Sequence, residues 1–255
     1  MIKLLTENKT LLITRAKFGF TILFVYVTLF ELVLPVNKIL PRPTLLWESL
    51  LSVWKDYNLI FELSVTTLVV YSSIIIGYLL VWLTRIPMFK LLSYFGDGFS
   101  NMRIFRYFPA FFYAVIFAFW FPESITAEFF FALVAVTFYM IVSIKENLET
   151  ITDSHLVVAN NLKISGKKLF GEIFWKNLQP AVFNSILKIH YFVWILILVF
   201  EYVGDYAGLG HVYNQALVYN DFAGLFSLAI YIALLIWFGD SVIKFTKSKI
   251  IYWEN

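Results

Sequence analysis

Residues 223–246 read AGLFSLAIYIALLIWFGDSVIKFT, and this stretch decides the class of fold. Its first charged side chain is Asp240, and the run before it is almost entirely apolar. The hydrocarbon core of a bilayer is about 30 Å thick, and a helix needs about 20 apolar residues to cross it. We therefore expect residues 223–246 to cross a membrane as a helix.

Similar runs recur along the whole chain, which is 60% apolar, 20% aromatic and only 15% charged. Soluble domains are about 25% charged, so the composition indicates a membrane protein. The other expected spans are residues 17–36, 59–84, 104–121, 126–144 and 180–203. We expect an all-α polytopic membrane protein, with residues 1–255 forming a single transmembrane domain of about six helices. Only residues 121–125, which include Pro122, separate the third and fourth spans, so these two should form an antiparallel pair.

Basic side chains gather in alternate segments between the expected spans. They lie in the amino-terminal lead, after span two, after span four and in the tail: Lys3, Lys9, Arg15, Lys17, Arg85, Lys90, Arg103, Arg106, Lys145, Lys163, Lys167, Lys168, Lys176, Lys244, Lys247 and Lys249. Segments rich in Lys and Arg stay in the cytoplasm. Six spans put all of these segments on one side. The pattern therefore predicts a multi-pass protein of the cell inner (plasma) membrane with both termini cytoplasmic.

Several other function classes are disfavoured. The first apolar run is too long for a signal peptide and has no clear cleavage site, so we interpret it as a retained span. The chain has no cysteine, which excludes disulfides and thiolate metal sites. His155, His190 and His211 are too scattered for a metal site evident in the sequence, and we expect no cofactor in this chain. A net charge of +3 is too small to indicate nucleic-acid binding.

Residues 37–58 should lie outside the cell between the first two spans. Apolar side chains repeat there at helical spacing and include Trp47 and Trp54. Such a helix suits the membrane interface, with its tryptophans at headgroup depth. A short helix packed on the bundle explains the same pattern, and the sequence leaves both interpretations open.

The longest cytoplasmic segment, residues 145–179, has amphipathic order. One helical piece fits residues 154–162, a break follows at 164–166, and a second piece begins near Lys167. Lys167 and Lys168 then lie in a first helical turn, where the helix dipole disfavours them by a few tenths of a kcal/mol. That placement suggests an acidic partner, although positive-inside signalling also explains the lysines. A helix–turn–helix between two spans suits the transmission of rigid-body motion to a cytosolic domain.

Two parts of this loop resemble the cytoplasmic loop of permease subunits of ABC importers. They are residues 159–165 (ANNLKIS) and 173–180 (IFWKNLQP). The family pattern reads Glu-Ala-Ala, three residues, Gly, then about nine residues and a hydrophobic-x-Leu-Pro. Ala159, Ser165 and Pro180 match the pattern or its common flanking residues, whereas Val157 and Val158 stand at the Glu and first Ala, Lys163 replaces the Gly and Lys176 replaces the Pro.

Further matches cover nearly the whole chain and resemble the nitrate/sulfonate/taurine branch of that family. They occur in the order that this branch has: Leu40-Pro41-x-Pro43, Gly77, Ile86-Pro87, Arg106-x-x-Pro109, Trp120-Phe121, Asn147, Glu201, Gly208-Leu209-Gly210, Ala216, Asp240 and Trp253. The branch handles oxyanions, sulfonates and vitamin-precursor-like molecules, but the sequence does not name a solute.

The resemblance implies a subunit that forms half of a solute pathway and couples through residues 153–175 to cytosolic ABC ATPase subunits. It also implies a second permease copy or paralogue, an extracytoplasmic solute-binding protein and contact with membrane lipid. ATP hydrolysis is expected on the partner, because the chain has no P-loop motif. The implied coupling residues are Ala159, Leu162, Lys163, Ile164, Ser165, Gly166 and Lys167. The departures from the pattern leave three forms open: a divergent homodimer, half of a heterodimer, or a subunit adapted to an unusual ATPase.

Four residues are candidates for the pathway or its gate. Glu201 lies near the outer end of span five, where an ionisable group serves either a structural role or a gate. Gly208 and Gly210 permit a tight extracellular turn, and an outer gate is the functional alternative. Lys188 is the basic residue deepest in a span, but near the cytoplasmic end it also has the option of extending its ammonium group to the interface.

Other functions fit parts of the sequence. A membrane enzyme acting on lipids needs clustered His, Asp or Cys, and the sequence shows no such cluster. A lipid-handling ABC-type permease, or a membrane scaffold that binds an ATPase without carrying solute, is compatible with the altered loop.

Overall fold

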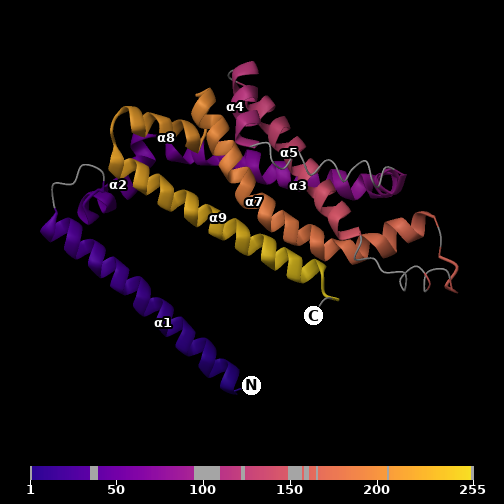
Figure 1. The fold of residues 1–255 in the computed structure, drawn as a ribbon. Coiled ribbons are helices and arrows are strands. Elements are labelled where there is room, and N and C mark those ends of the chain that lie inside the picture. Colours follow the sequence, from indigo (N-terminus) through magenta and orange to yellow (C-terminus); the bar gives the residue numbers. More distant parts are fainter. Residues whose placement is uncertain are drawn as a thin grey trace. The chain divides into compact units, whose positions relative to one another are not determined.

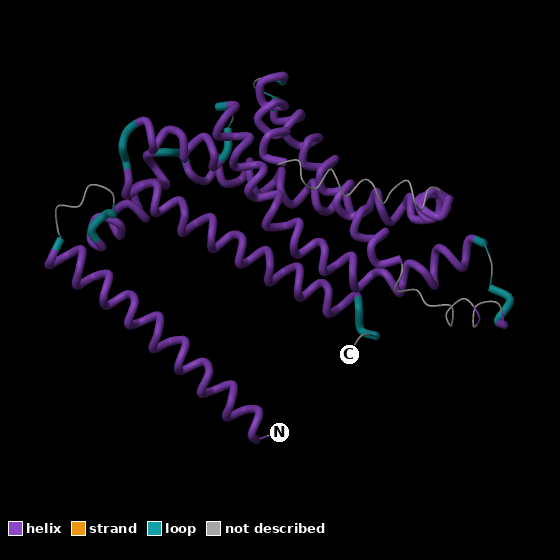
Figure 2. The backbone as a smooth tube through the Cα atoms, viewed as in Figure 1, coloured by secondary structure: helices purple, strands orange, loops and turns teal. Residues whose placement is uncertain are grey.

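The computed structural model describes residues 2–34, 40–94, 110–121, 124–148, 157, 161–164, 166–205 and 207–253. Within these residues every regular element is a helix, and short turns join some of them (Figure 2). The expected all-α class is therefore confirmed for the described part of the chain.

Five stretches of helix among the described residues are long and apolar enough to cross a membrane: Ala16–Val33, Leu59–Leu92, Ile125–Leu148, Leu169–Gly204 and Phe222–Ile250. In Figure 1 they belong to α1 (Ile2–Val27) with the π-helical turn η1 (Thr28–Val33), α3 (Leu59–Tyr94), α5 (Ile125–Leu148), η3 (Leu169–Phe174) with α7 (Trp175–Gly204), and α9 (Phe222–Ile250). By their length and composition, these helices are compatible with a multi-pass membrane protein.

The expected third span, residues 104–121, is only partly described. Its described helix is α4 (Ala110–Trp120), which has 11 residues. At 1.5 Å per residue such a helix is about 16 Å long, roughly half the hydrocarbon thickness. The remainder of the expected span lies outside the described residues. A count of six spans, and the orientation that depends on it, therefore stay predictions.

Span two is longer than predicted. The expected end was residue 84, ahead of Ile86-Pro87, but α3 continues through Pro87 to Tyr94. Proline removes one backbone hydrogen bond from a helix. Beyond it, Phe89 and Leu92 are buried, and the Phe89 ring lies 6.3 Å from that of Phe170 and 5.9 Å from that of Phe174. This aromatic packing offsets the missing bond, so the helix does not end at the proline.

The second helical piece of the expected cytoplasmic loop is continuous with the helix of the expected span five. We expected a separate helix from Lys167 and a span beginning at Pro180. Instead η3 leads directly into α7, and Pro180 lies inside that helix. Trp175, Leu178 and Gln179 just before the proline are all buried. Packing on both sides of the proline therefore maintains one helix.

The described residues divide into two compact units. One consists of residues 1–59 and 215–231, and the other of residues 60–214 and 232–255.

In the first unit, α2 (Pro43–Asp56) packs against the beginning of α9. The indole N–H of Trp54 donates to the Tyr231 hydroxyl at 2.7 Å, which donates to the Leu50 carbonyl at 2.6 Å. Trp47 on the same helix is 68% exposed. One face of the helix is therefore packed on the protein, while Trp47 is uncovered, and a place in the membrane interface stays a prediction.

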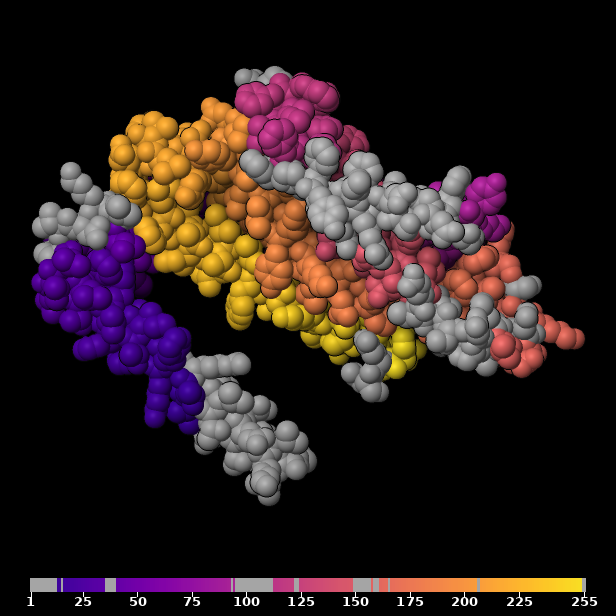
Figure 3. Space-filling view, in the orientation of Figure 1, coloured from indigo at the N-terminus to yellow at the C-terminus, as the bar shows by residue number. Residues whose placement is uncertain are grey.

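The start of α2 is joined to η1. Pro43 occupies the first turn, where its missing N–H leaves no bond unmade. The Thr44 hydroxyl donates to Glu31 at 3.1 Å, and the Tyr26 hydroxyl donates to the Pro41 carbonyl at 2.6 Å. By contrast, none of the described side chains in Ala16–Val33 is buried (Figure 3). Apolar side chains exposed along a whole helix are what a lipid-facing span requires.

In the second unit, α7 is the central element. It packs against both α4 and α5, and more than half of the residues in its most apolar stretch are buried. Close approach of α3 to α5 depends on Gly77, because a Cβ there would lie 2.7 Å from a methyl carbon of Val136. Small residues allow such approaches between membrane helices.

Candidate functional site: a buried acidic cluster

Four polar side chains meet where α3 and α5 begin and α7 ends. They are Glu62 and Thr66 of α3, Glu128 of α5 and Glu201 of α7, and we call them the acidic cluster. Thr66, Glu128 and Glu201 have no exposed surface. Ionisable groups buried within membrane helices are costly, which makes them candidates for function.

Glu201 receives two hydrogen bonds. The Thr66 hydroxyl donates to Oε1 at 2.6 Å, and the Gly210 backbone N–H donates to Oε2 at 2.8 Å. Thr66 in turn accepts the Leu209 N–H at 2.8 Å. The carboxyl group therefore joins α3, α7 and the start of α8 (Leu209–Val218) in one network.

Glycine is required at both ends of the Gly208-Leu209-Gly210 turn. Gly208 has φ +144°, and a Cβ there would collide with the Glu201 carboxyl group. A Cβ on Gly210 would lie 2.7 Å from the Glu201 Cβ and 2.8 Å from the Tyr202 nitrogen. The Gly208 N–H donates to Glu62. The turn thus lies directly on the acidic cluster, which brings together three of the four predicted pathway residues.

Glu128 differs from Glu201 because it has no donor. Among the described residues, neither of its carboxyl oxygens has a hydrogen-bond partner. Its carboxyl group lies against that of Glu201. A buried carboxylate without a partner costs several kcal/mol, so this arrangement calls for a bound species or a proton.

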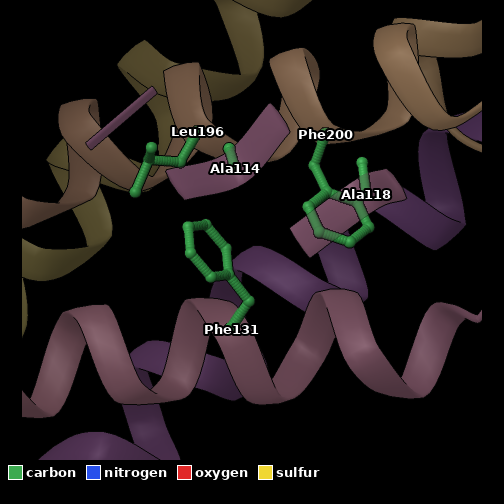
Figure 4. Close-up of a cluster of buried hydrophobic side chains, with 5 residues drawn as sticks. All are labelled: Ala114, Ala118, Phe131, Leu196 and Phe200. Atoms are coloured by element: carbon green, nitrogen blue, oxygen red, sulfur yellow. The ribbon is translucent and has the colours of Figure 1, made fainter. Parts of the chain in front are cut away.

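An apolar layer lies next to the cluster. Figure 4 shows Phe131 of α5 and Phe200 of α7 directed toward each other, with Ala114 and Ala118 of α4 beside them. The two rings are 5.9 Å apart between centroids. Phe131 follows Glu128 by one helical turn, and Phe200 directly precedes Glu201. The layer therefore adjoins the cluster in both α5 and α7.

Sequence reasoning missed Glu62, Thr66 and Glu128. Glu128 lies inside the predicted span 126–144, and an ionisable residue within a span is itself a signal. Glu62 lies inside the predicted span 59–84 and carries the same signal. Nothing in the sequence marks Thr66, because its role depends on the packing of α3 against α7.

The fourth pathway candidate, Lys188, lies elsewhere. Its side chain is exposed on α7, whereas His190 two residues on has no exposed surface. His190 accepts the Trp194 indole N–H at 3.1 Å and lies 3.3 Å from the Tyr71 hydroxyl. Its Nδ1 has no partner among the described residues. The structure therefore brings Lys188 to neither the acidic cluster nor this buried polar group.

The predicted coupling residues lie around a tight turn. Ala159 and Ser165 fall outside the described residues. Leu162 and Lys163 form a turn, Ile164 and Gly166 follow, and Lys167 begins the helix that becomes η3. Lys163 has φ +54° and Gly166 has φ +60°, so both adopt the left-handed conformation. The expected break at 164–166 is thus a turn that extends back to Lys163.

The helix after this turn is fixed to α3. The Arg85 guanidinium Nε donates to the Gly171 carbonyl at 3.3 Å, and Phe170 and Phe174 pack against Phe89.

A separate pair, His211 and Asp205, lies 2.7 Å apart at the end of α7, and His155 falls outside the described residues. The described part of the chain contains no group of three or more His, Asp or Glu residues that could hold a metal ion.

A comparison with models of protein families finds none that matches this chain, and no curated protein matches it either. Function therefore has to be argued from the residues and their geometry.

Proposed function

We propose that this chain is the membrane-spanning subunit of an ATP-binding cassette importer. It forms half of a solute pathway and couples to a separate cytosolic ATPase through residues 153–175. The observation that carries the proposal is the conformation of Lys163. The resembled family has glycine at this position, and here the lysine has φ +54°, a conformation that favours glycine. A left-handed conformation at this position supports the proposal, because the glycine of the motif serves such a turn.

A rigid connection from this turn into the bundle supports coupling. The helix Leu169–Gly204 has 36 residues and, at 1.5 Å per residue, is about 54 Å long. Polar contacts join it to α3 at four levels: Arg85 to Gly171, Tyr78 to Gln179, Tyr71 to His190, and Thr66 to Glu201. A displacement at Gly166 would therefore move α3 and α7 together. Rigid-body coupling through packed helices needs no chemistry in this chain.

We assign the role of a gate to the acidic cluster, which lies at the other end of the same helix. Backbone N–H groups of the Gly208–Gly210 turn donate to the cluster and so hold the start of α8 against α3 and α7. The remaining partners follow from the resemblance: a second permease copy or paralogue, an extracytoplasmic solute-binding protein and the surrounding lipid.

Co-purification with an ABC ATPase from the same genome tests the proposal. Charge reversals K163E and K167E, which both lie at exposed positions, should abolish ATPase binding and solute-stimulated hydrolysis. Lys55 of α2 is the matched control, because it is also exposed and is expected on the opposite side of the membrane. K55E should bind the ATPase like the wild type. Transport by an assembly that lacks this chain would overturn the proposal, and ATPase binding without transport would identify a scaffold instead.

Membrane orientation has its own test, which the cysteine-free sequence makes simple. A cysteine introduced at Lys167 should react with an impermeant maleimide only after the cells are opened, and one at Lys55 should react in intact cells. Labelling of position 167 from outside would invert the orientation and remove the basis for ATPase coupling.

A further inference from the structure

The carboxyl groups of Glu128 and Glu201 form a contact that two ionised groups would not sustain. Both side chains have no exposed surface, and the Glu128 oxygens have no donor among the described residues. Two negative charges in contact repel each other, and the repulsion grows in surroundings that exclude water. Phe131 and Phe200, which adjoin the pair in α5 and α7, are themselves buried among apolar side chains.

The two donors near the pair both serve Glu201. Thr66 and the Gly210 N–H occupy one oxygen each. Glu201 is therefore equipped to carry a negative charge, whereas Glu128 is not. A proton on Glu128 would turn one of its oxygens into a donor, and the adjacent carboxylate of Glu201 is the available acceptor. Carboxyl–carboxylate hydrogen bonds are charge-assisted and short.

We propose that Glu128 and Glu201 form a proton-binding site that holds one proton between their carboxyl groups. The proton enters from water, stays on Glu128 and is shared with Glu201, and the charge of the pair changes from −2 to −1. The bond joins the beginning of α5 to the end of α7 beside the Gly208–Gly210 turn. This inference does not depend on the ATPase partner.

The groups that face the pair come from each neighbouring element. From α3, Glu62 adds negative charge and Thr66 a hydroxyl. The turn before α8 supplies the Gly210 N–H, and α4 supplies the side chains of Ala114 and Ala118 near Phe131 and Phe200. Glu128 lies in the first turn of α5, where the helix dipole favours an anion. The dipole opposes protonation, while Glu62, burial and the absence of a donor favour it, and these three effects together are larger.

A metal ion is the other species that could relieve the repulsion. The described residues provide no set of three ligating His, Asp or Glu side chains, and the hydroxyl of Thr66 is already engaged by the Leu209 N–H and by Glu201. A proton needs only the two carboxyl groups. The geometry therefore favours a proton over a cation.

Infrared spectroscopy of the full chain in lipid vesicles tests this site. The wild type should show the carbonyl band of a protonated, buried carboxylic acid at neutral pH. The band should shift in D₂O and should be lost on raising the pH. E128Q should lose the band, because glutamine has no carboxylic acid. Its amide N–H still donates to Glu201, so the variant keeps a hydrogen bond between the two side chains. E31Q is the control, since Glu31 bonds to Thr44 in the other unit, and it should retain the band.

The wild-type spectrum alone decides the matter if a variant fails to fold. Absence of the band in folded wild-type protein at neutral pH would overturn the proposal, as would a band that persists in folded E128Q. A melting temperature that rises with sodium chloride but not with choline chloride, together with no acid band, would assign the site to a cation instead.

Discussion

Replacing Gly210 by alanine should destabilise the protein. Among the described helical glycines of the second unit, we expect this replacement to have the largest effect. The new Cβ would lie 2.7 Å from the Cβ of Glu201 and 2.8 Å from the backbone nitrogen of Tyr202. It would approach the Leu198 carbonyl oxygen more closely still. Two of these three neighbours are backbone atoms of α7, so the clash cannot be relieved by a side-chain rotation.

The magnitude follows from two contributions. Overpacking of a filled interior costs about 1–3 kcal/mol. If α8 moves away to relieve the clash, the bond from the Gly210 N–H to the Glu201 carboxylate is lost. A hydrogen bond to a charged group contributes about 1.5–3 kcal/mol. Because movement relieves part of the clash, the two contributions do not add fully, and we expect a loss of about 3 kcal/mol. That loss lowers the folding equilibrium constant by about a hundredfold.

Unfolding by SDS in mixed micelles, followed by tryptophan fluorescence, measures this loss. G19A is the matched control, because no atom lies within 4 Å of the position where its Cβ would be. Gly19 lies inside α1, so alanine there should leave stability unchanged or raise it by up to about 1 kcal/mol through helix propensity. A G210A protein that unfolds within about 0.5 kcal/mol of the wild type would refute the close approach of the turn to α7.

Three further predictions concern other positions. G77A should cost about 1–2 kcal/mol by the same micelle assay, because its Cβ would lie 2.7 Å from a Val136 methyl carbon and one of the two helices must shift. K163G should stabilise the turn around Lys163 by about 1 kcal/mol and G166A should destabilise it by a similar amount, since both positions have left-handed φ; amide hydrogen exchange of the turn would show opposite changes. Burial and then a neighbouring aspartate raise the pKa of the Tyr57 phenol, so its contribution to stability is complete below about pH 10 and is lost as pH rises toward the folded-state pKa. Alkaline melting curves of Y57F should lack this loss.

The sequence predicts most of the helical content because apolar runs are local signals. Residues 126–144 and 223–246 were expected as spans, and α5 and α9 contain them with a few residues more. The prediction was less accurate near two prolines. The span expected to end at residue 84 continues as a helix through Pro87, and the span expected to begin at Pro180 is part of a helix that begins before it. Proline is a local signal for a helix end, whereas the packing of Phe89, Phe170 and Trp175 that maintains the helices depends on the fold.

The candidate site was predicted only in part for the same reason. Glu201, Gly208 and Gly210 lie within ten residues of one another, so the sequence presents them together. Glu62 and Glu128 come from two other helices, and their approach to Glu201 is fixed by tertiary packing alone. At the loop before η3 the sequence predicted a break at 164–166 and did not mark Lys163 as part of it. Lys163 adopts φ +54°, which a lysine can do at a cost of about 1–2 kcal/mol.

The distribution of polar contacts determines which helix can respond to the proton. Contacts at four levels join α3 to the continuous helix of η3 and α7, so these elements should move as one body. Polar contacts between α5 and α7 include Ser143 with Ser185 toward the carboxyl-terminal end of α5, and Glu128 with Glu201 at its beginning. Loss of the shared proton removes the second contact and replaces it with repulsion, while the serine contact is uncharged and unaffected. The beginning of α5 should therefore tilt away from α7 about the serine pair. The Gly208–Gly210 turn should stay on Glu201, because the bond from the Gly210 N–H strengthens as that carboxylate becomes fully charged.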